Sequence, residues 1–350
     1  MKSKWERKLI EDICEKASSN IAQKNLDGLS GNYPVYGASG YIQNVDFYQR
    51  DTEYIGIVKD GSGVGRVNTY PAYSSLLGTM QYILPKKGYS LQFVAYALKS
   101  LNLASFAAGA AIPHIYFRDY GKCEVSVPPL DEQQRIVAEL DLLTGVIDKQ
   151  EAQLKELDTL AQSIFYDMFG DPIENEKGWN VKKISDVSQD VFAGGDKPED
   201  FKDAPTDEYC YPIIANGIGD RGVLGYSRKY RVGSDAVTIG ARGASIGNCR
   251  ICKAFFTPVV RLITIIPSAA VDITFLYFVV QLLNFNINGA GQAQLTVPNV
   301  KSQVIPVPPL ALQQEFADKI QSIEKQKAAV NQSIAETQKL QDYTMDKYFG

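Results

Sequence analysis

The stretch with the clearest capacity for chemistry is YIGIVKDGSGVGRV, at residues 54–67. Three of its glycines, Gly61, Gly63 and Gly65, alternate with small residues after a β-branched run, as in loops that bind phosphate. A Walker loop, however, continues through Gly-Lys-Ser/Thr into a helix whose N–H groups face the phosphate. Here Arg66 leads into VNTYP, a strand-like segment that ends at Pro71. We therefore predict a strand, a tight glycine turn and a second strand, and no nucleotide site.

Two further groups could bind a metal or take part in catalysis. The single histidine, His114, has no cysteine or serine motif paired with it, and no carboxylate stands at a useful spacing. Cys249-Arg-Ile-Cys252 is formally a C-x-x-C pair, but a structural zinc site needs a second pair or nearby histidines. The pair also lies in a β-branched run, where successive side chains alternate between faces. We predict no catalytic residue and no metal site in this chain.

These groups belong to a chain that repeats itself. VPPLDEQQRIVAEL, from Val127, recurs 180 residues later as VPPLALQQEFADKI, from Val307, and the match continues to the Phe-Gly pairs that begin at residues 169 and 349. The glycine stretch has a counterpart in TIGARGASIGNC, from Thr238. A period this long indicates a duplicated domain. We predict an α+β or mixed fold with two homologous α/β domains, each followed by a long helix.

The repeat also predicts where the domains begin and end. They are a first lobe at residues 1–126, a central helix at 127–170, a hinge at 171–178, a second lobe at 179–305 and a C-terminal helix at 306–350. The apolar run from Ile273 to Leu283 is too short to cross a bilayer and indicates a buried helix. The charged start, MKSKWERKLIED, is unlike an export signal, and five unevenly spaced cysteines suit a reducing compartment. We therefore expect a cytoplasmic protein with no membrane partner.

Both long helices carry an apolar stripe. In the first helix, apolar residues recur at alternating spacings of four and three, and only Gln150 interrupts them. This stripe consists of Leu140, Leu143, Ile147, Leu154, Leu157, Ala161, Ile164 and Met168. The second helix keeps the register through Ile320, Ile323, Val330 and Ile334, and then turns polar at Thr337, Gln341 and Thr344. Such heptads are typical of coiled coils.

We predict that the two stripes bury each other in an intramolecular antiparallel coiled coil. At 1.5 Å per residue this rod would be roughly 55 Å long, which exceeds one turn of B-DNA, about 34 Å. An alternative is that each helix packs only on its own lobe. Polar residues at Lys327, Thr337 and Gln341 also leave room for dimerisation or for a seam that a partner completes.

Charge is unevenly distributed along the chain. The formal net charge of −4 would argue against a nucleic-acid partner if it were uniform. Both lobes instead carry a small basic excess, whereas residues 127–174 are strongly acidic and better suited to a protein partner. The window 221–261 has Asp235 as its one acidic residue against Arg221, Arg228, Lys229, Arg231, Arg242, Arg250, Lys253 and Arg261. It predicts a phosphate-facing surface, and the alternative is a solvated face with counter-charges from elsewhere in the lobe.

Two variable lobes, each closed by a Pro-Pro-Leu-x-x-Gln-Gln helix, are the most specific feature of this sequence. With VPPLDEQQRIV, SIFYDMFGDPIENEKGW, VPPLALQQ and the terminal DKYFG, essentially the whole chain resembles the specificity (S) subunit of Type I restriction–modification systems. Each lobe also has a glycine-rich segment where the family has one, AAGAAIPHI and GAGQAQLTV, although the first lacks the glutamine usual there.

The resemblance implies a DNA-reading scaffold without catalysis of its own. Each lobe would be a target-recognition domain for one half of a bipartite site in double-stranded DNA, and the coiled coil would set the unread spacer. DNA methyltransferase (modification) subunits and restriction/translocase subunits would be its protein partners. S-adenosylmethionine, ATP and magnesium would belong to those subunits, and this chain would carry no cofactor.

The sequence itself also favours a non-catalytic subunit. It lacks the Asn-Pro-Pro-aromatic motif of an amino-methyltransferase, and no Rossmann fingerprint follows a strand. Two other functions stay open. The chain could be a stand-alone DNA-binding regulator without a methyltransferase partner, or a coiled-coil adaptor whose lobes bind protein.

Candidate DNA contacts follow from side-chain chemistry. For phosphate we predict Arg221, Arg228, Lys229, Arg231, Arg242 and Arg250 in the second lobe and Lys59, Arg66, Lys86 and Lys87 in the first. For base edges we predict side chains near glycine turns, namely Ser62, Asn68, Ser245, Asn248, Gln292 and Gln294. The alternative for each of these is a turn residue that satisfies its own backbone. His114 would be structural or a DNA-contacting loop residue.

Overall fold

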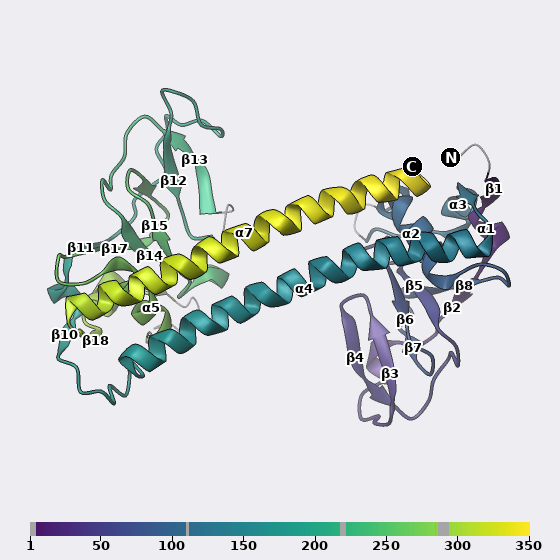
Figure 1. Ribbon diagram of the computed structural model, residues 1–350, viewed down its shortest axis with the longest axis horizontal. Coiled ribbons are helices and arrows are strands. Elements are labelled where there is room, and N and C mark those ends of the chain that lie inside the picture. Colours follow the sequence, from purple (N-terminus) through teal and green to yellow (C-terminus); the bar gives the residue numbers. More distant parts are fainter. Residues whose placement is uncertain (1–4, 110–111, 218–221, 284, 286–293) are drawn as a thin grey trace. The chain divides into compact units, whose positions relative to one another are not determined.

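The fold is that of a computed structural model, which describes residues 5–109, 112–217, 222–283, 285 and 294–350 (Figure 1). Contacts divide the chain into two units, one formed by Met1–Glu151 with Asn331–Gly350 and the other by Ala152–Val330. Each unit contains one lobe and the adjoining halves of both long helices. The lobe boundaries expected from the sequence stay a prediction, because the contacts group each lobe with helix segments.

The first lobe contains three small sheets, with strand orders β2-β8-β5-β6, β4-β3-β7 and β1-β9. Its strands are β1 (Glu6–Leu9), β2 (Cys14–Ser18), β3 (Tyr33–Gly37), β4 (Gly40–Val45), β5 (Tyr54–Val58), β6 (Val67–Tyr70), β7 (Ser75–Leu76), β8 (Met80–Pro85) and β9 (Glu124–Val127). Its helices are α1 (Ile10–Ile13), α2 (Leu91–Ser100) and α3 (Phe117–Tyr120). All pairs are antiparallel except β3 with β7.

The second lobe repeats this topology strand for strand, with orders β11-β17-β14-β15, β13-β12-β16 and β10-β18. Its strands are β10 (Val181–Lys183), β11 (Ser188–Ala193), β12 (Tyr211–Ile214), β13 (Val223–Ser227), β14 (Ala236–Ile239), β15 (Cys249–Cys252), β16 (Thr257–Pro258), β17 (Ile263–Pro267) and β18 (Val304–Pro306). Its helices are α5 (Ile273–Leu282) and α6 (Val297–Lys301). The single parallel pair recurs too, as β12 with β16. The predicted duplication of a mixed α/β lobe is confirmed.

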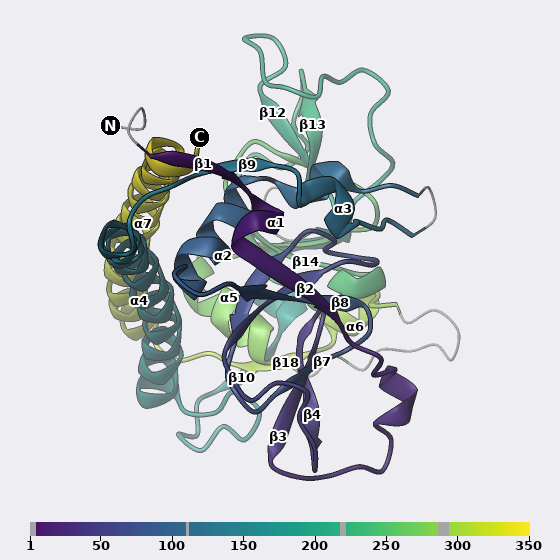
Figure 2. The ribbon, with the colours of Figure 1, turned by 90° about the vertical axis from the view of Figure 1, so that its right-hand side faces the viewer.

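One lobe helix covers each four-stranded sheet. In β5 the side chains alternate, because Ile55 and Ile57 join the cluster that contains α2 while Tyr54 and Val58 join a cluster on the other face. Figure 2 shows α2 between the sheet of the first lobe and the long helices. The predicted buried helix in the second lobe is confirmed as α5, which packs on β14 in the equivalent way.

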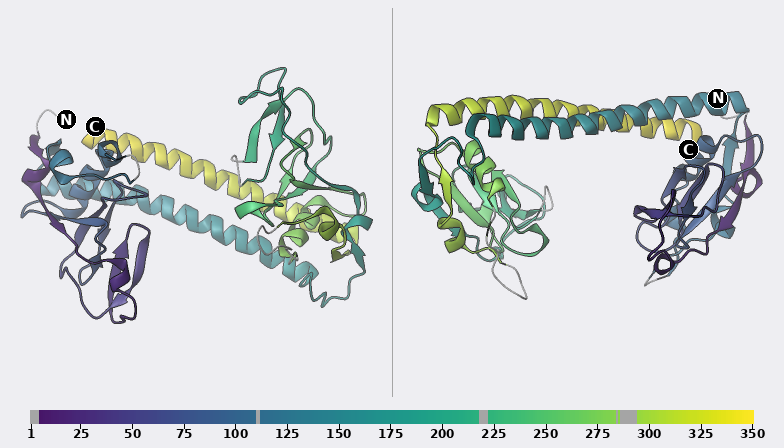
Figure 3. Two further views of the ribbon diagram at one scale, coloured as in Figure 1. Left: turned by 180° about the vertical axis from the view of Figure 1, so that it is seen from behind. Right: turned by 90° about the horizontal axis from the view of Figure 1, so that it is seen from below.

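Two long helices complete the fold, α4 (Leu130–Phe169) and α7 (Leu310–Phe349), each of 40 residues. Asp131 lies in the first turn of α4, where the helix dipole favours an acidic side chain. Figure 3 shows that in each unit the lobe lies to one side of its helix segments. No helix in the described part of the chain has both the length and the hydropathy needed to span a bilayer.

The two helices pair antiparallel. In the first unit, Gln341 donates to the Thr144 hydroxyl over 2.8 Å, and Gln150, the predicted break in the stripe, donates to the Ser333 hydroxyl over 2.6 Å. Residue numbers thus fall along α7 as they rise along α4. In the second unit, Lys327 pairs with Asp158 at 2.8 Å. The predicted intramolecular antiparallel coiled coil is confirmed, and Lys327 and Gln341 find partners within the chain.

A glutamine of the Pro-Pro-Leu-x-x-Gln-Gln motif attaches each long helix to its own lobe. Gln133 is buried, donates its amide N–H to the Pro128 carbonyl over 3.0 Å, and accepts the backbone N–H of Ser90 over 2.9 Å. Ser90 is the N-cap of α2, so one side chain joins the start of α4 to the start of α2. Gln313 makes the same two bonds in the second lobe, to Pro308 at 2.8 Å and Asp272 at 2.8 Å.

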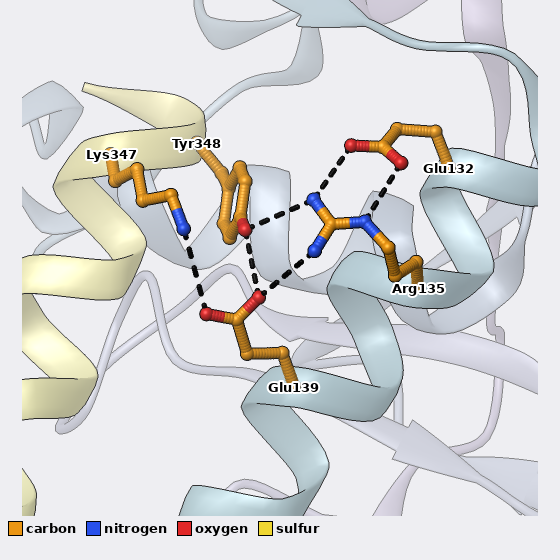
Figure 4. A network of polar contacts seen from close by, with 5 residues as sticks. All are labelled: Glu132, Arg135, Glu139, Lys347 and Tyr348. Atoms are coloured by element: carbon orange, nitrogen blue, oxygen red, sulfur yellow. Dashed lines mark hydrogen bonds and ion pairs between the residues drawn. The ribbon is translucent and has the colours of Figure 1, made fainter. Parts of the chain in front are cut away.

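The end of α7 is bound to the start of α4 by a polar network in the first unit (Figure 4). The Tyr348 hydroxyl donates to Glu139 over 2.7 Å and accepts from Arg135 over 3.2 Å, while Lys347 pairs with Glu139 at 3.6 Å. Arg135 also donates twice to Glu132. The network adds polar contacts to the packing of Met345, Tyr348 and Phe349 against the core of the first lobe.

Candidate nucleic-acid interface

The glycine stretch of the first lobe is a tight turn between β5 and β6. The Val58 N–H donates to the Arg66 carbonyl over 3.0 Å, and the Gly65 N–H donates to the Val58 carbonyl over 2.8 Å. Gly65 has φ +86°, and a Cβ there would lie 2.4 Å from the Ala104 nitrogen, so both its conformation and its surroundings require glycine. The predicted order of strand, glycine turn and strand is confirmed.

The second lobe builds the same turn between β14 and β15. The Gly240 N–H donates to the Asn248 carbonyl over 2.9 Å, and the Gly247 N–H donates to the Gly240 carbonyl over 2.9 Å. Gly243 and Gly247 also have positive φ, as Gly61 and Gly65 have in the first lobe. One backbone scaffold therefore presents two different sets of side chains.

A second segment crosses each turn and pairs with it. In the first lobe, Asp60 and His114 form an antiparallel bridge, and a ring nitrogen of His114 contacts the Asp60 carboxylate. In the second lobe, the bridge joins Arg242 and Gln294, and the Arg242 guanidinium donates to the Gln294 amide oxygen over 3.3 Å. The expectation that His114 lacks a carboxylate partner was wrong, because strand pairing brings Asp60 to it across 54 residues of chain.

These bridges place different chemistry at equivalent points. Arginine and glutamine, the residue types of Arg242 and Gln294, have donors and acceptors that can match guanine and adenine in the major groove. The Asp60–His114 pair instead offers a carboxylate acceptor and an imidazole. A shared turn with exchanged side chains is suited to reading two different nucleic-acid sequences with one backbone geometry.

Other predicted residues of the first lobe fall into two groups. Ser62 and Arg66 lie on the exposed surface of the turn, where the Arg66 guanidinium donates to the carbonyls of Ser62 and Gly63. Lys59, which pairs with Asp60 at 3.8 Å, and Asn68, exposed on β6, lie next to them. Lys86 and Lys87 do not join this group.

Lys86 and Lys87 lie at the opposite end of the lobe sheet from the glycine turn. They follow β8, whose first residue, Met80, pairs with Val58 beside the turn. The Lys86 ammonium donates to the Glu11 carbonyl over 2.9 Å. A role of these two lysines in phosphate binding stays a prediction, but one separate from the turn.

The basic window of the second lobe is also divided. Arg228 pairs with Asp200 at 3.4 Å and with Glu208 at 3.0 Å, so counter-charges from elsewhere in the lobe offset it, as the alternative to a phosphate-facing surface foresaw. Arg231 lies over the Phe192 ring at 4.3 Å, and Lys229 is exposed beside it. These three follow β13, whereas Arg242 lies on the glycine turn.

The remaining predicted residues of the second lobe lie on its glycine turn or on β15, the strand that follows the turn. Ser245 and Asn248 are on the turn, and the Ser245 hydroxyl donates to the Arg242 carbonyl over 3.3 Å. Arg250 is half-buried, lines a cavity of about 390 Å³, and donates to the Ala215 carbonyl over 3.0 Å. Arg221 and Gln292 lie outside the described residues, as do parts of the segments AAGAAIPHI and GAGQAQLTV.

Arg261 is a candidate that sequence reasoning did not select. Val260 and Arg261 both have left-handed backbone, with φ 53° and 61°, which is strained for residues with a Cβ and typical of functional sites. The Asn216 amide donates to the Val260 carbonyl over 2.6 Å and accepts the Ala241 N–H over 3.1 Å. Through these two bonds, Asn216 connects the backbone next to exposed Arg261 with the backbone at the start of the glycine turn. The basic window contained Arg261, but no sequence pattern marks its backbone.

Comparisons with known proteins agree with this architecture. A family model described as the Type I restriction modification DNA specificity domain matches residues 2–159 and 176–339.

The chain belongs to this family.

Two putative type I specificity subunits of Mycoplasma pneumoniae are each 29% identical to it and cover 88% of this chain, over 86% and 95% of their own lengths. The solved S subunit of a Type I restriction-modification system from M. genitalium has a TM-score of 0.65 at 16% identity, over 99% of this chain and 96% of that one. A second solved chain, from a study of the assembly and conformational transition of a type I R-M system, has a TM-score of 0.57 at 17% identity, over 98% and 97%.

The two matches to the specificity-domain model coincide with the structural repeat. Each matched range holds one lobe and most of the long helix that follows it. The glycine turn and its crossing segment therefore recur once per specificity domain.

The two cysteines of the C-x-x-C pair in the second specificity domain pack in different hydrophobic clusters. Cys249 packs against the cluster around α5, whereas Cys252 belongs to a cluster on the other face of β15. Burial raises the pKa of the Cys249 thiol to about 12 and raises that of Cys252 as well. Two thiols on opposite faces of a strand cannot share a metal ion or a disulfide. Among the described residues, no cluster of three or more His, Cys, Asp or Glu side chains could hold a metal.

Proposed function

We propose that this chain is the DNA-specificity subunit of a Type I restriction–modification complex. Each lobe reads one half of a bipartite site, and the glycine turn carries the reading side chains. The observation that carries the proposal is the exchange of Asp60–His114 for Arg242–Gln294 on one conserved backbone frame. A scaffold that keeps its backbone while changing its donors and acceptors is what two different half-sites require.

The paired helices would set the spacer between the half-sites. Each helix is about 60 Å long at 1.5 Å per residue, compared with about 34 Å for one turn of B-DNA. Hydrogen bonds made by Gln133 and Gln313 join the start of each helix to its own lobe. A rigid attachment is necessary if helix length is to determine spacer length.

The chemistry would come from partner subunits. In this proposal methyltransferase subunits, with S-adenosylmethionine, modify the site that this chain selects, and restriction/translocase subunits use ATP and magnesium. The chain itself supplies DNA recognition, since its sequence has no methyltransferase motif. The acidic segment at 127–174 is suited to contact with protein and not with phosphate.

Methylation-site sequencing tests the proposal. The chain is expressed with its cognate methyltransferase subunit in a host that lacks other DNA methylation. We expect one methylated bipartite motif with a spacer of fixed length, and no methylation when this chain is omitted. A chain that binds DNA but never co-purifies with the methyltransferase would contradict the proposal and favour the stand-alone regulator. A chain that binds no DNA in the complex would favour the adaptor.

A further inference from the structure

Each lobe carries a cluster of three aromatic rings at equivalent positions. In the first lobe, Tyr48 lies 4.8 Å from Tyr33 and 5.2 Å from Tyr73 between ring centroids, in edge-to-face contacts. In the second, Tyr230 lies 5.0 Å from Tyr211 and 4.9 Å from Phe255, again edge to face. We call these the aromatic triads.

The backbone around the two triads is the same. The Arg50 N–H donates to the Ser74 carbonyl and the Ser74 N–H donates back to Arg50, both over 3.2 Å. Val232 and Phe256 exchange the same two bonds, over 2.9 and 3.1 Å. Tyr73 precedes Ser74 and Phe255 precedes Phe256, so the triads are equivalent elements of the duplicated domain.

Both triads contain an aromatic residue in a strained conformation. Tyr73 has φ 56° and Phe255 has φ 68°, and a bulky side chain in the left-handed region costs free energy. Packing within the triad leaves much of this residue uncovered, because Tyr73 is 52% exposed and Phe255 is 48% exposed. Glycine would fit this backbone without strain. A strained and half-exposed ring at the same point of both lobes points to a contact made by the ring.

The triads and the glycine turns belong to different segments of each lobe. Tyr73 precedes β7, and the chain then runs through β7 to Thr79, whose carbonyl accepts the Lys59 N–H beside the turn over 3.0 Å. Between Tyr73 and Thr79 the chain also turns, because the Met80 N–H donates to the Leu77 carbonyl over 2.9 Å. The exposed rings are therefore part neither of the glycine turn nor of the segment that crosses it.

The charges beside the triads differ between the lobes while the rings stay. Next to Tyr48 the first lobe has Asp46 and Phe47, whereas next to Tyr230 the second lobe has Arg228 and Lys229. A polyanion would meet Lys229 beside the second triad and Asp46 beside the first, since Asp200 and Glu208 already offset Arg228. What the triads share is exposed aromatic surface, the kind of surface that is enriched at protein–protein interfaces.

We propose that the two triads are docking surfaces for two copies of one protein, the DNA methyltransferase subunit of the complex. This rests on the proposed function. Each copy would accept the rings of Tyr48 and Tyr73, or of Tyr230 and Phe255, in an apolar pocket. Reading different half-sites demands that the glycine turns differ, whereas binding the same partner twice demands that another surface of each lobe stay alike.

Glycine substitution separates partner binding from folding. Tyr73→Gly and Phe255→Gly remove the ring and also relieve the backbone strain, so thermal stability of the full chain should rise or stay equal. Affinity for the purified methyltransferase subunit, measured by calorimetry with the full-length chain, should fall at least about tenfold at the altered lobe. The double variant should lose both high-affinity sites.

Two matched controls accompany these variants. Asn102→Gly relieves another left-handed residue, with φ 45°, and should raise stability without a change in methyltransferase binding. Tyr41→Ala removes a ring that is 60% exposed and outside the triad, and should leave binding unchanged. The glycine variants are also titrated with site DNA, where we expect unchanged affinity and salt dependence.

The outcomes distinguish the two proposals. If the unaltered chain binds methyltransferase and the glycine variants bind it equally well, the docking surface is wrong and the proposed function stands. If DNA affinity falls while methyltransferase affinity does not, the triads contact DNA. If the unaltered chain binds no methyltransferase, both the docking surface and the proposed function are wrong.

Discussion

Glu132 and Arg135 are joined by two hydrogen bonds, of 2.7 and 2.8 Å, within the first turns of α4. Hydrogen bonding from the Arg135 guanidinium lowers the pKa of the Glu132 carboxyl below its ordinary value, and the pKa of Arg135 is raised correspondingly. A lowered folded-state pKa makes the ionised carboxylate stabilising above the unfolded pKa of about 4.3, and this contribution is lost as pH falls through the lower folded value.

Glu132→Gln should therefore reduce the acid sensitivity of the fold. At pH 7 the variant should be less stable than the unaltered chain, by about 1 kcal/mol or less because the pair is partly exposed. Below pH 4 the two melting temperatures should converge. Thermal unfolding between pH 7 and pH 3 measures this. Glu151→Gln, at an exposed position of the same helix, should keep the original pH dependence, and parallel curves for Glu132→Gln would contradict the prediction.

Loss of the motif glutamine should detach a long helix from its lobe. Gln133→Leu leaves the Ser90 N–H and the Pro128 carbonyl without their partner, which costs about 1–3 kcal/mol for a buried polar group. Denaturant unfolding should show a lower midpoint. Gln134→Leu alters the exposed neighbour and should change stability little. Equal effects of the two substitutions would show that the buried bonds do not attach the helix.

Arg242 should contribute more to DNA binding than Arg228. Arg242→Ala should weaken binding of the assembled complex to its site and reduce the slope of log affinity against log salt by about 1. Arg228→Ala should have a smaller effect, because Asp200 and Glu208 already offset that charge. Fluorescence anisotropy across a salt series compares them. A larger loss for Arg228→Ala would place the phosphate contact after β13 and not on the glycine turn.

Removing one heptad from both helices should shorten the spacer. Residues 144–150 of α4 and 335–341 of α7 are matched across the pairing between Thr144 and Gln341. Their joint deletion shortens the pair by about 10 Å, close to three base pairs. Methylation-site sequencing should find the same half-sites with a shorter spacer. Deletion from one helix only is the control and should impair assembly. An unchanged spacer in the joint deletion would exclude the ruler role.

Thiol reagents should distinguish the cysteines by burial. Cys210 is exposed, whereas burial raises the pKa of Cys14 and of Cys249 to about 12. Because the thiolate is the reactive form, maleimide at pH 7 should modify Cys210 well before the other two. Peptide mass spectrometry of the native chain at early times measures the order, and unfolded chain is the control. Rapid labelling of Cys249 would contradict its place in the core.

Periodic and local features of the fold were accessible from the sequence. The helix at 273–283, the heptads of both long helices and the strand–turn–strand geometry of the glycine stretches all depend on neighbours within a few residues, and the structure confirms them. The repeat was visible because duplication preserves spacing. These predictions succeeded because, in these segments, the local sequence pattern and the local backbone preference favour the same structure.

The candidate site was less accessible, because its contacts join distant parts of the chain. Spacing alone gave His114 no partner, although strand pairing brings Asp60 to it. Arg228 and Arg242 both lie in the basic window at 221–261. The charge of Arg228, however, is offset by Asp200 and Glu208, which lie outside that window in the sequence. The aromatic triads combine three segments of each lobe, and no local pattern predicts the left-handed backbone at Tyr73 or Phe255.

The sequence by itself determined a duplicated chain of two mixed lobes and two heptad helices, since these follow from composition and period. Tertiary structure alone decided which side chains meet on each turn, which charges are offset and which rings stay exposed. The physical reason is that strand register, set by the packing of the whole lobe, controls contacts between residues far apart in the chain. In this protein, the candidate recognition surface depends on those contacts, whereas the architecture depends on the repeat.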